Sequence, residues 1–126
     1  MINGPVGITN TGVTFQTSGS RALALQLIKV SADEAEAAHV HEGHETALYL
    51  LKGTLVVRHG DWLQEETVVR PGEFFYLPAG VVHTFRCLDP AEPCLAVAAR
   101  NDPDAREPAL SLPELTPLLE QLHRAA

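Results

Sequence analysis

Features that would direct this chain to particular partners or compartments are absent or scarce in its 126 residues. Lysine and arginine together number 9 against 16 acidic residues, which gives a net charge of −7, and no basic stripe is present that would neutralise nucleic-acid phosphates. No segment approaches the roughly 20 apolar residues of a membrane span. The first residues, MINGPVGITNTG, have neither the basic start nor the apolar centre of a secretory signal. We therefore expect a cytoplasmic protein that binds neither nucleic acid nor membrane.

Cysteines and large aromatic side chains are also few. Cys87 and Cys94 are too few for a disulfide framework. They could face each other across a hairpin with residues 88–93 as its loop and form one bridge, but a cytosolic chain favours reduced thiols. One tryptophan and two tyrosines do not suggest a stacked-aromatic platform for carbohydrate.

The chain instead contains a series of short apolar runs separated by turn residues, with 9 glycines and 9 prolines. Such runs predict β-strands, and the absence of helical patterns between them excludes an alternating βα fold. The length suits a single domain that buries about two-thirds of its unfolded surface. We predict an all-β sandwich or closed barrel with its core at about residues 12–100. The predicted strands are residues 13–16, 22–30, 46–51, 54–59, 62–70, 74–77, 82–88 and 94–100.

The remaining segment, about residues 101–126, has a different composition. It contains four prolines, so it should cross the surface without regular strand pairing. Thr116 and Pro117 suit the start of a short C-terminal helix that ends near Arg124. An apolar stripe on this helix favours packing against the barrel wall, and the main alternative is a contact in a homodimer, which is the expected assembly. The stripe consists of Leu115, Leu118, Leu119 and Leu122.

Histidines gather in residues 39–45, HVHEGHE. His39 and His41 are two positions apart, so on an extended strand they project from the same face. Imidazole and carboxylate groups bind first-row divalent metals at neutral pH. Far along the chain, His83 follows a Pro-Ala-Gly turn that could bring it back beside the first pair. Three surface histidines in a polar loop is the alternative interpretation, and the second motif favours a metal site over it.

These two segments together resemble the motifs of the cupin family. The first family motif is His-x-His, then a glutamate, then a turn glycine. The second is glycine, five residues, Pro-x-Gly, two residues, histidine, three residues, asparagine, and every spacing through the histidine matches, with Cys87 at the asparagine position. The matching residues are His39, His41, Glu45, Gly53, Gly72, Pro78, Gly80 and His83.

The resemblance implies a jelly-roll β-barrel that holds one divalent metal, which could be iron, zinc, manganese or nickel. Open positions on the metal would admit a small oxygenated molecule. With iron the expected chemistry is that of a dioxygenase, and with the other metals it is Lewis-acid isomerase or lyase chemistry. An enzyme is favoured over the alternative of a non-catalytic cupin that binds or senses a small ligand. The implied metal ligands are His39, His41, Glu45 and His83.

The fourth ligand is the point at which the chain departs from the family pattern. Glu45 precedes Gly53 by eight positions, whereas the family's commonest spacing is seven. Counting back from Gly53 puts Thr46 at the inward position, so Glu45 reaches the metal only if a bulge lies between Glu45 and Tyr49. Without that bulge, His44 is the candidate ligand. We favour Glu45, because a carboxylate completes a mixed nitrogen and oxygen set.

The same alternation predicts which side chains line the cavity. Cys87 has the parity of His83, and we interpret it as a small buried apolar side chain. The alternative is a soft group near the metal that tunes it or is oxidised by it. The predicted cavity-lining residues are Thr46, Leu48, Leu50, Phe85 and Cys87.

Overall fold

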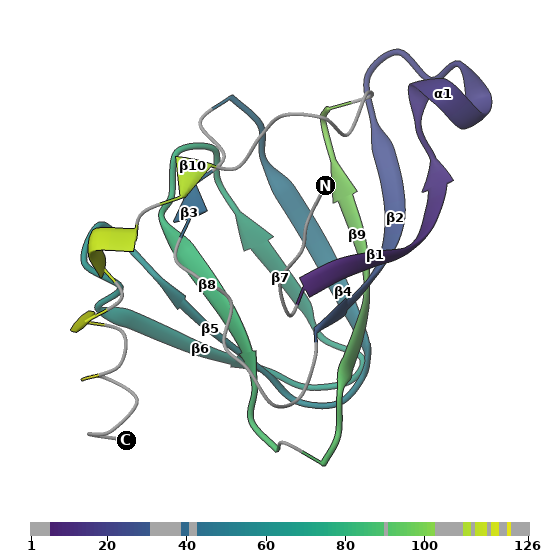
Figure 1. Ribbon diagram of the computed structural model, residues 1–126. Coiled ribbons are helices and arrows are strands. Elements are labelled where there is room, and N and C mark those ends of the chain that lie inside the picture. The colour runs from purple at the N-terminus through teal and green to yellow at the C-terminus, as the bar shows by residue number, and fades with distance from the viewer. Residues whose placement is uncertain are drawn as a thin grey trace.

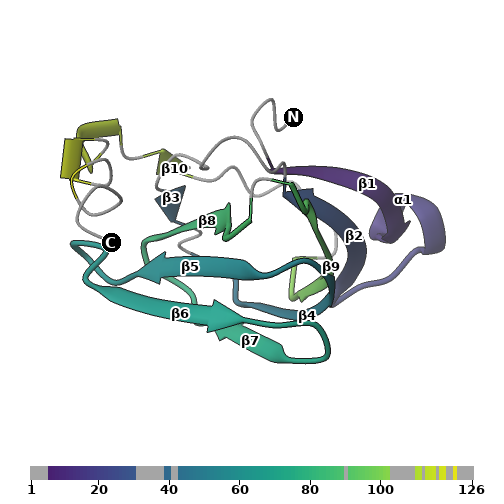
Figure 2. The same cartoon turned by 90° about the horizontal axis from the view of Figure 1, so that it is seen from below.

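The computed structural model describes residues 6–30, 39–40, 43–89, 91–102, 110–111, 113–115, 117–118 and 121. Within them, ten strands form two five-stranded antiparallel sheets that enclose the core between them (Figures 1 and 2). The first sheet has the order β1 (Val6–Val13), β2 (Ala24–Val30), β9 (Cys94–Arg100), β4 (Thr46–Lys52) and β7 (Phe74–Leu77). The second has the order β10 (Leu110–Ser111), β3 (His39–Val40), β8 (His83–Cys87), β5 (Leu55–His59) and β6 (Glu65–Val69). The prediction of a mostly β fold is confirmed.

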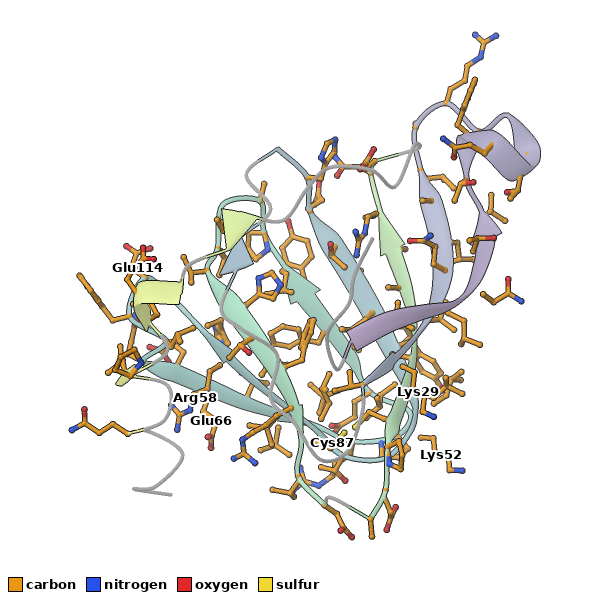
Figure 3. The ribbon with its side chains drawn as sticks, in the orientation of Figure 1. Lys29, Lys52, Arg58, Glu66, Cys87 and Glu114 are labelled. Carbon is orange, nitrogen blue, oxygen red and sulfur yellow. The ribbon has the colours of Figure 1, made fainter. Side chains whose placement is uncertain are left out.

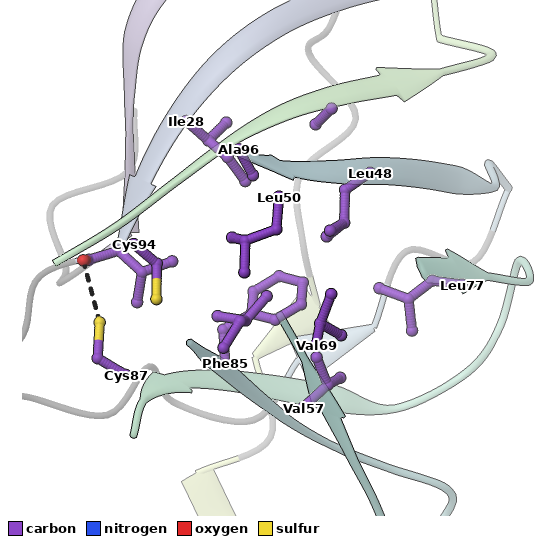
Figure 4. Close-up of a cluster of buried hydrophobic side chains, with 13 residues drawn as sticks. Ile28, Leu48, Leu50, Val57, Val69, Leu77, Phe85, Cys87, Cys94 and Ala96 are labelled. Atoms are coloured by element: carbon purple, nitrogen blue, oxygen red, sulfur yellow. Dashed lines mark hydrogen bonds between the residues drawn. The ribbon is translucent and has the colours of Figure 1, made fainter. Parts of the chain in front are cut away.

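The strands follow from alternating burial along the chain. In β4, Thr46, Leu48 and Leu50 are buried, while Ala47 and Leu51 are exposed, as expected for a strand with one face on the core. Phe85 and Cys87 of β8 are buried as well. The cluster between the sheets joins both sets, with Ile28, Val57, Val69, Leu77 and Ala96 among its other members (Figure 4).

Two glycines make the turns that the strands require. Gly72 has φ 89°, and Glu73 N–H donates to the Arg70 carbonyl at 3.0 Å. Pro71-Gly72 therefore occupies the centre of a turn that suits type II, as the sequence predicts. Gly53 has φ 82°, and a Cβ at this position would lie 2.9 Å from both Cys94 Sγ and the Pro93 carbonyl oxygen. Close packing as well as the backbone conformation thus requires glycine at the end of β4.

The two sheets do not close into a barrel, contrary to the prediction. Within the described residues, no strand ladder connects one sheet to the other. The turn after β6 explains the open edge on that side, because Gly72 N–H donates to the Leu50 carbonyl at 2.8 Å and Leu50 N–H donates to the Glu73 carbonyl at 3.1 Å. These bonds join the chain to β4, so β7 extends the first sheet while β6 remains the edge of the second.

One predicted strand is wrong at the N-terminal end. Residues 13–16 were expected to be extended, but β1 begins at Val6 and ends at Val13, and a four-residue helix, α1 (Phe15–Ser18), follows. The Thr14 hydroxyl caps the start of this helix by accepting from Thr17 N–H, and the Thr17 hydroxyl accepts from Thr14 N–H. Gly19 caps the other end in a left-handed conformation. These local bonds to the backbone override the alternation of apolar residues.

Two described residues of the C-terminal segment, Leu115 and Leu118, pack on the outside of the second sheet. A 3-10 turn, η1 (Pro113–Leu115), places Leu115 in a buried cluster with Val40, Leu63 and Val82, and Leu118 packs against that cluster. Two of the four predicted stripe leucines therefore contact the protein's own core. The predicted C-terminal helix itself is not shown, because most of residues 116–126 lie outside the described part. None of the helices in that part is long and apolar enough to cross a membrane.

Both cysteines are buried free thiols, so the alternative of a single bridge is not realised. The Cys87 thiol donates to the Val30 carbonyl at 3.3 Å (Figure 4). Burial, followed by the hydrogen bond with Cys87, raises the pKa of Cys94 to about 12. A thiol that stays protonated is a weak nucleophile and a weak metal ligand.

Candidate metal centre

The second sheet brings residues of the two histidine motifs together. His39 of β3 and His83 of β8 are direct partners across the antiparallel ladder, although they lie far apart in sequence. His41 lies outside the described residues, as does the side chain of His39. In the described part of the chain, no group of three or more candidate ligands is gathered around one point.

His83 is the best-defined member of the site. It is 3% exposed, and its Nδ1 lies 3.0 Å from the carbonyl oxygen of Val81. Because a carbonyl only accepts, Nδ1 carries a proton, and in the neutral form of the ring Nε2 carries the lone pair. A bond of this kind from one ring nitrogen is the usual way in which proteins orient a histidine that binds metal through the other. His83 thus fits a divalent metal.

The turn before β8 positions this ring. Gly80 has φ 80°, in the Pro-Ala-Gly turn that precedes the strand. Gly60 N–H then donates to the Val82 carbonyl at 2.9 Å, which fixes the chain at the entry to β8. The ring of His83 packs against that of Phe85, with 5.3 Å between centroids. The sequence interpretation of this turn as a device that presents His83 is consistent with these contacts.

Glu45 lies on the other side of the first sheet. The Tyr76 hydroxyl donates to Glu45 Oε1 at 2.7 Å, and Glu45 N–H donates to Asn101 Oδ1 at 2.9 Å. Tyr76 is 54% exposed, whereas its neighbour Leu77 faces the core. The bond with Glu45, followed by desolvation and by the negative charge of Glu45, raises the pKa of Tyr76. The carboxylate therefore lies on the outer face, away from His83.

The bulge predicted between Glu45 and Tyr49 is absent, and this prediction is wrong. Residues 46–49 pair without interruption with β7, and residues 46–50 pair in the same way with β9. The irregularity lies later, between Leu50 and Lys52. With a regular ladder, Thr46 is inward and 8% exposed, and the alternation puts Glu45 outside. The half-buried His44 has the inward parity, two positions before Thr46.

A histidine that sequence reasoning missed extends the same row of the sheet. His59 of β5 is the direct ladder partner of His83, so the register runs from His39 through His83 to His59 across three neighbouring strands. His59 is half-buried and its ring packs edge-on against Phe75 of β7, with 5.6 Å between centroids. The alternation along β5, in which Leu55 and Val57 are core residues, is the signal that could have found it.

The walls around this row are apolar. Leu48, Leu50, Phe85 and Cys87 all belong to the core cluster between the sheets. A separate shallow hollow of about 220 Å³ lies on the outer face of the first sheet, where Glu45, Tyr76 and Arg100 line it. The hollow lies on the outer face of the first sheet, whereas the histidine row belongs to the second sheet, so they are distinct sites.

Residues 26–99 match the model of the cupin domain family. The chain belongs to the cupin family. Among curated protein sequences, none matches the chain. The cupin match spans both sheets and both histidine motifs, which agrees with the resemblance found in the sequence.

Solved structures with similar folds include several enzymes. The TT1209 protein of Thermus thermophilus is 31% identical, with 66% of this chain and 75% of that chain covered and a TM-score of 0.56. An oxalate oxidase is 18% identical, with 98% of this chain and 67% of that chain covered and a TM-score of 0.71. The DMSP lyase DddQ of Ruegeria pomeroyi DSS-3 is 21% identical, with 73% and 44% covered and a TM-score of 0.61. The last two similarities show the shared fold.

Proposed function

We propose that this cupin is a metal-dependent enzyme that acts on a small oxygenated molecule. The observation that carries the proposal is His83: a buried imidazole whose Nδ1–H is held by the Val81 carbonyl at 3.0 Å, opposite His39 in the ladder. A ring fixed in this way has the tautomer and the orientation that a metal-binding histidine needs. Solved neighbours that are named as an oxalate oxidase and a DMSP lyase support a catalytic role for the fold.

The proposed metal ligands are His39, His41 and His83, with His44 as the fourth. What supports His44 over Glu45 is the regular ladder of β4 and the bond from Tyr76 to the Glu45 carboxylate. An all-imidazole set suits divalent zinc, copper, iron or nickel. When bound, the metal would supply Lewis-acid activation of an oxygen group or, with iron, binding of dioxygen.

The chain's own residues would supply orientation and a dry environment. The Val81 carbonyl holds the His83 ring in one tautomer, so the ring could bind a metal without reorientation. Leu48, Leu50 and Phe85 exclude water from the inner wall, which strengthens electrostatic contacts with a polar substrate. Thr46, buried at the start of β4, offers a hydroxyl near this wall.

Metal analysis tests the proposal directly. Purified wild-type protein should retain one divalent ion per chain after dialysis, and His83→Ala should retain less than a tenth of that amount. His123→Ala, which changes a histidine that lies outside both motifs and is not proposed to bind metal, is the matched control and should keep its metal. Oxygen uptake by the iron-loaded protein with small organic acids then separates dioxygenase from Lewis-acid chemistry. Full metal retention by His83→Ala would contradict the assigned site.

A further inference from the structure

We propose that His59 is a substrate-binding residue of this site, which donates a hydrogen bond to an anionic oxygen, a carboxylate or an enolate, on a ligand held beside the metal. The inference rests on the proposed function, and it adds a residue that neither histidine motif contains. Its starting point is the register of the second sheet, in which His59 and His83 are direct partners on neighbouring strands. Side chains at such positions project to the same face, with Cβ atoms about 4.5–5.5 Å apart.

The orientation of His59 toward the inside is fixed by its neighbours. Leu55 and Val57, at the same parity of β5, belong to the core between the sheets. The His59 ring packs edge-on against Phe75, which belongs to the opposite sheet. Arg58, which precedes His59 in the strand, points the other way and forms an ion pair with Glu66 at 3.0 Å on the outer side of β5 and β6 (Figure 3). The imidazole therefore lies between the sheets, on the wall that carries His83.

One nitrogen of the His59 ring is held by a hydrogen bond, and the described residues supply no partner for the other. His59 Nε2 lies 3.0 Å from the Thr67 hydroxyl on β6, and within the described residues Thr67 is its one hydrogen-bond partner. Glu65, the ladder partner of His59 on β6, is exposed and forms no ion pair with it in that part of the chain. An anionic ligand oxygen that reaches the second ring nitrogen would accept a hydrogen bond from it when that nitrogen carries a proton. The hydrogen bond to Thr67 and the contact with Phe75 thus fix the orientation of the His59 ring.

The chemistry of the wall favours an anionic ligand. The core-facing described residues of β4, β5 and β8 are apolar side chains, threonine, cysteine and the two histidines, and none of them is acidic. A divalent cation beside two imidazoles would leave this surface positive. A donor aimed at a carboxylate or enolate oxygen forms a charge-assisted bond, which is about twice as strong as a neutral one. His59 thus distinguishes an anionic substrate from a neutral one of the same size.

The test uses the cobalt-loaded protein with azide as the probe, followed by the change in visible absorption. His59→Phe keeps a ring beside Phe75 but removes the donor. We expect it to bind one equivalent of cobalt with wild-type affinity and to bind azide about tenfold more weakly, the loss expected for one hydrogen bond to a charged group. His59→Gln, which keeps a donor, should recover most of the azide affinity. Arg58→Gln, on the opposite face of the same strand, is the control and should leave both affinities unchanged.

The outcomes separate this inference from the proposed function. Wild-type azide affinity in His59→Phe would overturn the role of His59 alone, as would a cobalt affinity that falls together with the azide affinity, since His59 would then be a metal ligand. A wild-type protein that binds no cobalt would overturn the proposed function and this inference with it. Should His59→Phe not fold, as judged by circular dichroism, His59→Ala makes the same comparison.

Discussion

Tyr76 donates a hydrogen bond to Glu45 across the first sheet, with 2.7 Å between the phenol oxygen and Oε1. This bond holds the Glu45 carboxylate on the outer face of the sheet. In the family pattern, that carboxylate would bind the metal. Asn101 adds a second tie by accepting from the Glu45 amide at 2.9 Å. Glu45 would have to break the bond to Tyr76 and reverse its strand parity to reach the side of His83.

This relationship predicts unequal effects of two conservative substitutions on metal affinity. Glu45→Gln should change the affinity by less than about threefold, because its carboxylate lies outside the site. His44→Gln should weaken binding by at least tenfold, because loss of a true ligand removes a coordinate bond. Parallel titrations with the same metal decide between them. A larger loss in Glu45→Gln would restore Glu45 as the ligand, and negligible losses in both would leave a site of three histidines.

The same bond predicts the titration of Tyr76. Its pKa is raised chiefly because the hydrogen bond to Glu45 favours the protonated phenol. As pH rises through that pKa, the phenolate forms and the bond is lost. In a Tyr49→Phe background, which leaves Tyr76 as the one tyrosine, the ultraviolet absorbance of the phenolate reports this step. Glu45→Gln should lower the midpoint, and an unchanged midpoint would show that the bond does not persist in solution.

Gly53 provides a stability prediction with a matched control. Gly53→Ala places a Cβ 2.9 Å from Cys94 Sγ and the Pro93 carbonyl oxygen at φ 82°. It should lower the free energy of unfolding by about 1–2 kcal/mol for the left-handed backbone and by about 1–3 kcal/mol more for overpacking. Gly19→Ala has a similar φ of 75° and no atom within 4 Å, so only the first contribution applies. Urea denaturation of both variants measures the difference, and equal losses would mean that the hairpin adapts without strain.

Much of the fold could be predicted because apolar and polar residues alternate along a strand, and this alternation can be read from the sequence. Leu48, Leu50 and Phe85 were placed inward by counting in twos, and all three are buried. The start of α1 was missed because Thr14 and Thr17 bond locally to the backbone, and apolar spacing does not report such bonds. The sequence could not show whether the sheets close into a barrel. Closure depends on which strand the chain pairs with after a turn, and the alternation within each strand does not report that pairing.

The site could be predicted only as far as the motifs reached. His83 was found from the Pro-Ala-Gly turn, whose spacing is specific. The orientation of Glu45 depends on the ladder of β4, and two counts from the flanking motif residues gave opposite answers. His59 was missed because it stands in neither motif, and its significance appears only when β5 and β8 are aligned in register.

The buried thiols give a last prediction, on reactivity and on pH. Burial is the main reason that the pKa of Cys94 is raised to about 12, and its side chain is 1% exposed. Cys87 is buried as well, at 5% exposed. Because a reagent cannot reach either side chain in the native protein, both cysteines should resist a thiol reagent at pH 8 and react fully in denaturant. The unfolded thiol loses its proton near its ordinary pKa of about 8.5, while the folded thiol retains its proton up to about pH 12. The stabilisation is therefore complete below pH 8.5 and declines as pH rises from there toward 12. Urea denaturation of Cys94→Ala should accordingly show a shallower loss of stability between pH 8.5 and 10 than the wild type. Rapid labelling of a native thiol at pH 8, or identical pH slopes for the two proteins, would contradict this account of the core.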